Sequence, residues 1–137
     1  KNGELGSQDY AEAVRWYRMA AEQGNASALY DLALMYSTGE GVLQDSSEAA
    51  RLYRMAAEQG NASAQMDLAY MYFRGEGVPQ NFTNAYILFN LAAAEVKFGA
   101  RDYRDSVANR LTDDQINEAQ RLLSEWKVGE PLPLQED

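Results

Sequence analysis

The ten residues MAAEQGNASA occur twice in the chain, at Met19–Ala28 and again at Met55–Ala64. Shifting the sequence by 36 residues extends the likeness, because Asn25–Gly60 matches Asn61–Val96 at 18 of 36 positions. Self-similarity at this period is typical of stacked structural units, each of which buries its apolar face against its neighbours. The chain is therefore predicted to form a repeat architecture.

Within each copy the apolar residues recur with the period of an α-helix. In the central copy they fall at i, i+3, i+4, i+7 and i+8, which is one face of a helix. A second, shorter helix is predicted over 26–37 and over 62–73, so that each unit is an antiparallel helix pair. The helical face is expected to be Ala49, Leu52, Tyr53, Ala56 and Ala57, with its equivalents Ala13, Trp16, Tyr17, Ala20, Ala21 and Ala85, Leu88, Phe89, Ala92, Ala93.

The repeated EQGN is expected to be a turn between helices. Gly24 and Gly60 stand where a helix ends with a positive φ, and Asn25 and Asn61 can cap the next helix. The repeated GEGV is expected to end the shorter helix, with its valine returning to the core. A phosphate-binding loop is the alternative for GEGV, but no strand precedes it and no Lys-Ser/Thr pair follows.

Composition excludes several classes of function. The 137 residues carry a net charge of −9, which disfavours nucleic acids and anionic membranes. The absence of His and Cys removes the usual general base, thiolate chemistry and the commonest ligands of transition metals. No cofactor, metal site or catalytic residue is therefore predicted.

Two further patterns have alternative explanations. Paired carboxylates such as Asp31 and Asp67 on successive helices could serve a hydrolase, but no nucleophile or base accompanies them. Three N-x-S/T sequons begin at Asn25, Asn61 and Asn81. Glycosylation would need a eukaryotic secretory setting, and the first two sequons follow from the capping residues themselves.

The repeated residues resemble the Sel-one-like repeat (SLR) family, a branch of the tetratricopeptide-like superfamily. The resemblance covers about residues 9–96 and implies an all-α fold, a right-handed solenoid of antiparallel helix pairs with about seven helices. The residues that carry it in one copy are Ala26, Ala28, Leu32, Ala33, Tyr36, Gly39, Gly41, Val42, Asp45, Ala49, Leu52, Tyr53, Ala56, Ala57 and Gly60.

The ends of the chain depart from the repeat. The first helix is expected at Asp9–Gln23 after a trace of a preceding loop, and Val96 in place of a glycine favours a helix that continues toward Gly99. Thr112–Gln115 is a capping box that opens a last helix reaching about Trp126. The single domain is thus divided into a partial first repeat that holds only a second helix (1–24), two full repeats (25–60 and 61–96), a degenerate repeat with a C-terminal capping helix (97–127) and an extended tail (128–137).

Successive first helices of such a solenoid line its concave surface, and in tetratricopeptide-like members this groove binds peptides. Asp31, Asp67 and Glu40 lie around the groove, and some of its residues could instead pack between helices. The residues predicted to bind a partner there differ between copies while the core does not; they are Tyr30, Leu34, Ser37, Met66, Tyr70, Phe73 and Arg74.

The predicted function is a non-catalytic scaffold or adaptor that holds a peptide or protein segment in this groove. A cell-wall-directed hydrolase is one alternative, because cysteine-rich family members are linked to cell-wall substrates, and a structural spacer within a longer repeat protein is another. The resemblance favours a bacterial periplasmic or secreted location. Weak self-association is expected through the N-terminal end, where Val14, Trp16 and Tyr17 would lack a covering helix.

A metal chelator should leave the thermal unfolding midpoint unchanged. Without His or Cys, only hard cations on exposed carboxylates could bind, and they would bind weakly. Thermal melts followed by circular dichroism with and without EDTA test this, and a fall of the midpoint with chelator would contradict it.

Overall fold

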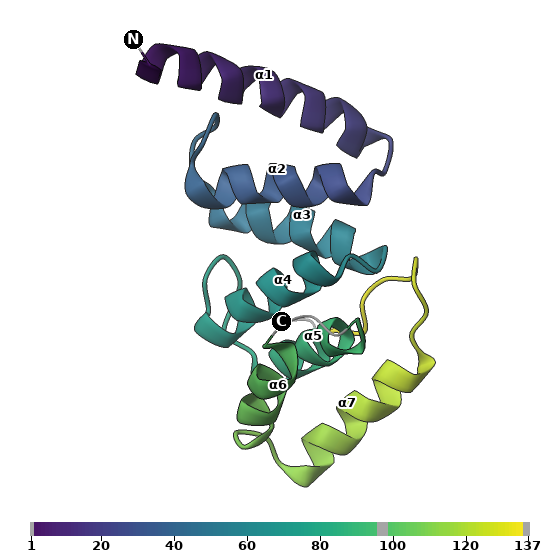
Figure 1. Ribbon diagram of the computed structural model, residues 1–137. Helices are drawn as coiled ribbons and strands as arrows, with labels where there is room; N and C mark the ends of the chain where they lie inside the picture. Colours follow the sequence, from purple (N-terminus) through teal and green to yellow (C-terminus); the bar gives the residue numbers. More distant parts are fainter. Residues whose placement is uncertain (1, 96–98, 136–137) are drawn as a thin grey trace.

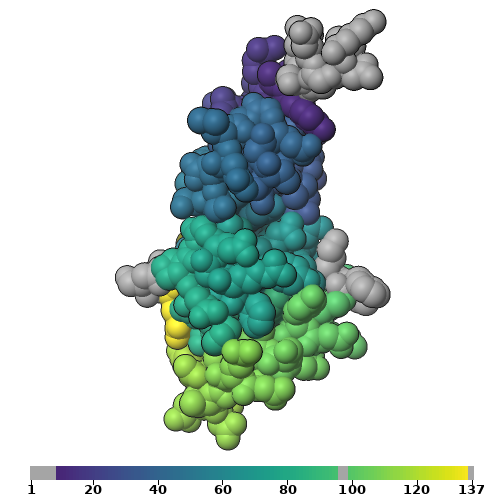
Figure 2. Space-filling view, turned by 90° about the vertical axis from the view of Figure 1, so that its left-hand side faces the viewer, coloured from purple at the N-terminus to yellow at the C-terminus, as the bar shows by residue number. Residues whose placement is uncertain are grey.

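The computed structural model describes residues 2–95 and 99–135, and this part of the chain forms seven α-helices and no strand (Figure 1). The helices stack in chain order along one long axis, from purple to yellow-green in Figure 2. This confirms the predicted all-α helical repeat. The helices are α1 (Asn2–Glu22), α2 (Ala26–Thr38), α3 (Ser46–Glu58), α4 (Ala62–Arg74), α5 (Phe82–Ala94), α6 (Ala100–Ala108) and α7 (Asp113–Glu125).

The turns between units have the predicted capping geometry. The side chain of Asn25 accepts the N–H of Ala28 at 2.9 Å, and that of Asn61 accepts the N–H of Ala64 at 2.8 Å. The glycine before each asparagine has a positive φ, 81° in one turn and 89° in the other. The capping box at the start of α7 is also present. These local signals therefore set five helix boundaries, namely the ends of α1 and α3 and the starts of α2, α4 and α7.

Both glycines of each GEGV loop have a structural reason. Gly39 and Gly75 end α2 and α4 in the left-handed conformation, with φ of 81° and 72°. A Cβ atom on Gly77 would lie 2.5 Å from the carbonyl oxygen of Ser46, so the loop approaches the start of the preceding second helix too closely for a side chain. The valines that follow pack against the core, as predicted.

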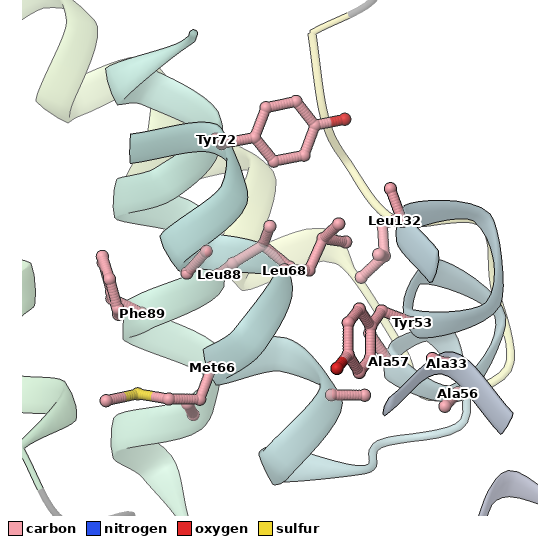
Figure 3. Close-up of a cluster of buried hydrophobic side chains, with 14 of the residues drawn as sticks. Ala33, Tyr53, Ala56, Ala57, Met66, Leu68, Tyr72, Leu88, Phe89 and Leu132 are labelled. Atoms are coloured by element: carbon pink, nitrogen blue, oxygen red, sulfur yellow. The ribbon is translucent and has the colours of Figure 1, made fainter. Parts of the chain in front are cut away.

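Small residues line the contacts between helices, and larger ones fill the space beside them. Ala33, Ala56 and Ala57 have no exposed surface, and Tyr53 is 3% exposed. Figure 3 shows these side chains in one buried cluster with residues from α4 and α5. The repeated apolar face of α3 and α5 is thus the core of the solenoid, as the periodicity predicts.

Several predicted boundaries are wrong. The first helix begins at Asn2 rather than at Asp9, and no proline stands between the two positions to interrupt it. The helix before Gly99 ends at Ala94, where the N–H of Glu95 returns to the carbonyls of the last turn. Val96, on which the expected extension depended, lies outside the described residues.

Trp16, which the periodicity placed on the core face but which was also expected to lack a covering helix, is 63% exposed, whereas Val14 is only 4% exposed. The equivalents of Trp16 in the next two units, Leu52 and Leu88, are buried because a helix covers each of them. No described helix packs on the corresponding side of α1. The self-association expected for this end stays a prediction.

The chain after α7 turns back across the second helices of the repeats, as Figure 1 shows in yellow. We call residues 129–135 the return segment. The N–H of Gly129 donates to the carbonyl of Glu58 at 2.7 Å, and the N–H of Leu132 donates to the Glu58 carboxylate at 3.1 Å. The amide of Asn84 then binds both the N–H and the carbonyl of Gln135, at 2.7 and 3.1 Å. Leu132 is buried in the core cluster (Figure 3).

Tyr53→Ala should destabilise the protein far more than Tyr30→Ala. Truncation of a buried aromatic residue costs roughly 3–5 kcal/mol of the free energy of unfolding. Tyr30 is only half-buried and packs against Tyr53 at the surface. Urea denaturation of both variants measures the difference, and equal losses would contradict the assignment of the core.

Candidate functional site

The first helices α2, α4 and α6 form one face of the stack, and this face is hollowed between the two full repeats. The hollow has a volume of about 250 Å³. We call it the first-helix groove. It is lined by Ser37, Tyr53, Asp67, Tyr70, Met71, Arg74, Glu76 and Tyr103.

One wall of the first-helix groove is aromatic. The rings of Tyr70 and Tyr103 meet edge to face with their centroids 4.9 Å apart, and Phe89 stacks on Tyr103 at 5.3 Å. The guanidinium of Arg74 lies 5.4 Å from the centroid of Tyr70, within the range of a cation–π contact. Packed rings of this kind present a rigid apolar surface with a positive charge at its edge.

The opposite side of the groove is polar. The hydroxyl of Tyr30 donates to the Asp67 carboxylate at 2.9 Å, a bond that links α2 to α4 across the repeat boundary. Burial, with the Asp67 charge beside it, raises the pKa of Tyr30 above its ordinary value. Arg74 also lies 3.9 Å from Glu76. The groove therefore offers hydrogen-bonding groups of both charges next to the aromatic wall.

In the ranges 2–95 and 99–135, no three acidic side chains come close enough together to hold a metal ion. None of the helices described is long and apolar enough to cross a membrane. What the groove can do chemically is enclose a side chain, contact it with aromatic rings and hydrogen-bond a neighbouring backbone.

Four of the seven predicted binding residues gather at the first-helix groove. Ser37, Tyr70 and Arg74 line it directly, and Tyr30 lies behind it through its bond to Asp67. Two helices of different units supply these side chains. A hollow therefore lies on the first helices, where the partner-binding groove was predicted, and the binding itself stays a prediction.

The other three predicted residues lie elsewhere. Met66 is 6% exposed and belongs to the core, because α6 begins over it at Gly99. Phe73 packs on Phe82, with ring centroids 5.7 Å apart, outside the hollow. Leu34 is exposed on α2 but does not line the groove.

Sequence reasoning missed Tyr103, which is 39% exposed and completes the aromatic wall from α6. Tyr103 lies in the segment 97–127, whose degenerate repeat pattern did not show which of its residues face the groove. The 36-residue shift could have found it, because Tyr103 stands 36 residues after Asp67, which itself stands 36 residues after Asp31. Tyr53 was assigned to the core alone, yet it also forms part of the groove lining.

Comparison with known proteins identifies the repeat. A family model described as the Sel1 repeat matches residues 1–25, 26–61 and 62–95. The chain is similar to the crystal structure of c5321, a protective antigen that is present in uropathogenic Escherichia coli strains and displays an SLR fold. The two share 32% sequence identity and a TM-score of 0.79, and the match covers 90% of this chain and 26% of that one. It is also similar to a Sel1 repeat protein from Oxalobacter formigenes, with 29% identity and a TM-score of 0.62 over 84% of this chain and 54% of that one.

The chain spans about a quarter of the first of these proteins and about half of the second. No curated protein matches it significantly.

Tyr70 should lose its proton late in an alkaline titration. Burial and the hydrogen bond with Tyr103 raise the pKa of Tyr70 from 10.0 to about 12. Because the unfolded chain releases this proton near pH 10, the contribution of Tyr70 to stability is complete below that pH and is lost as pH rises toward 12. Absorbance at about 295 nm measures phenolate formation, and Tyr70→Phe should remove amplitude near pH 12; loss of amplitude near pH 10 would contradict this.

Proposed function

The chain belongs to the Sel1 repeat family, and from that premise we propose that it is a non-catalytic scaffold that holds a partner's peptide segment in the first-helix groove. Sel1 repeats mediate protein–protein interactions, and members of the family are typically non-catalytic. The finer assignment, to a peptide segment in this particular groove, is supported by the shape and composition of the groove.

The observation that carries the proposal is the open aromatic wall with Arg74 at its edge. Tyrosine and arginine dominate the binding energy of protein interfaces, because they contribute large contact area together with directed hydrogen bonds. Tyr103 remains 39% exposed although its ring is held by two others, so the wall is formed before a ligand arrives. Such preorganisation lowers the entropic cost of binding.

The polar side of the groove would orient the segment. Asp67 and Glu76 can accept backbone or side-chain N–H groups, and Arg74 can donate to a carbonyl or a carboxylate. The hollow of about 250 Å³ suits one or two side chains of a longer segment better than a complete cofactor. No observation favours the hydrolase, since no nucleophile–base pair is present among the lining residues.

Peptides selected on the full chain from a random displayed library test the proposal. Their affinities for the wild type and for variants are then measured by fluorescence anisotropy. Tyr103→Ala and Arg74→Ala should each weaken binding about thirtyfold, which corresponds to the loss of one interface hot spot of about 2 kcal/mol. Both side chains are exposed, so the fold should survive their removal.

Arg121→Ala is the matched control, because Arg121 is an exposed arginine on α7 with its own acidic partners. It should leave the affinity unchanged. Selected peptides that bind both groove variants as tightly as the wild type would refute the first-helix groove as the binding site.

A further inference from the structure

The return segment shows what the other face of this fold, formed by the second helices, can hold. The segment lies along the groove between α3 and α5, over α4. It runs from Glu58 at the end of α3 to Asn84 in the first turn of α5. Besides the bond from the Gly129 N–H to the Glu58 carbonyl, three contacts matter for the comparison below: the Glu58 carboxylate on a backbone N–H, the buried side chain of Leu132, and the amide of Asn84 on both backbone groups of Gln135.

One repeat earlier, the groove between α1 and α3, over α2, is open. Its volume is about 300 Å³. Six of its ten lining residues recur unchanged 36 positions later in the groove that holds the return segment. The identical pairs are Arg18 and Arg54, Ala21 and Ala57, Glu22 and Glu58, Leu32 and Leu68, Tyr36 and Tyr72, and Leu52 and Leu88.

We propose that the groove between α1 and α3 binds an extended, leucine-bearing, acidic segment of a partner protein in the way that the next groove holds the return segment. This second site lies between the second helices α1 and α3, over α2, shares no lining residue with the first-helix groove and does not depend on it. The return segment of the same chain is already bound between α3 and α5, so the occupant comes from another molecule.

Two of the three contacts have direct equivalents. Glu22 stands at the repeat position of Glu58, is exposed, and can accept a backbone N–H of the segment. Leu32 stands at the position of Leu68, beside which Leu132 is buried (Figure 3). A leucine of the partner would enter the hollow at this point, where apolar side chains from α2 and α3 already form the floor.

The third contact differs from the one that holds the return segment, and this difference determines which segments the site prefers. Glu48 replaces Asn84, and a carboxylate accepts an N–H but cannot donate to a carbonyl. Arg51 replaces the buried Ile87 and is held against Glu48 by two hydrogen bonds of 2.9 and 2.6 Å. Its remaining N–H groups, with those of Arg18 nearby, would receive an acidic side chain of the segment.

A fluorescein-labelled peptide with the sequence of residues 128–135 is the probe, and fluorescence anisotropy with the full chain is the measurement. We expect saturable binding, at least fivefold weaker for the peptide with Leu132→Ala and at least twofold tighter for the peptide with Gln135→Glu. Absence of binding would overturn the proposal, and so would an equal affinity for the peptides with and without Leu132→Ala.

Variants of the full chain locate the site. Glu22→Ala should weaken binding at least fivefold, whereas its exposed neighbour Gln23, which does not line the groove, should tolerate Gln23→Ala without change. Arg51→Ala should abolish the advantage of the Gln135→Glu peptide. If Glu58→Ala alters binding and Glu22→Ala does not, the peptide has displaced the return segment from its own groove, and the proposal is wrong.

Sedimentation of the full chain distinguishes the source of the segment. A monomer at the concentrations of the binding assay supports a partner protein as the source. A dimer that the free peptide dissociates would mean that the groove takes the return segment of a second copy, and it would overturn the assignment to a partner protein.

Discussion

Close approach of helices through alanine side chains is the constraint on which the rest of the structure depends. Ala33, Ala56 and Ala69 have no exposed surface, because each lies where one helix meets the next. Small side chains at these positions let the backbones pack closely, and the larger Tyr53 and Leu88 fill the space that remains. Since the same small residues recur every 36 positions, the groove between α1 and α3 is lined largely by residues that recur in the groove between α3 and α5.

Features determined by neighbouring residues in the chain could be predicted from the sequence. The caps formed by Asn25, Asn61 and Thr112 depend on side chains that reach a backbone N–H three residues later, so the local pattern is sufficient. The helix pairs followed from periodicity alone. The first-helix groove was predicted where Tyr70 and Arg74 differ from their equivalents in the other repeat, because a conserved packing role would have kept the residues alike.

Features determined by what covers a residue in space could not be predicted in this way. Met66 and Trp16 both occupy ambiguous helical positions, and only the presence of α6 over one and the lack of a described helix over the other separates core from surface. The return segment is the clearest case. Its two prolines and acidic residues indicated an extended chain, but nothing local showed that Leu132 would reach the core or that Asn84 would bind its backbone.

The two identical turns have an evolutionary consequence. A repeated coding stretch invites unequal recombination, and an exchange between the two copies of MAAEQGNASA would delete one unit of 36 residues. The shortened chain would join α1 to α4 through a turn with the same glycine and asparagine. Glu22 would then stand where Glu58 now accepts the N–H of Leu132, so the return segment would keep its anchor. Unit number in this fold can therefore change in one genetic step without loss of the contacts that close its end.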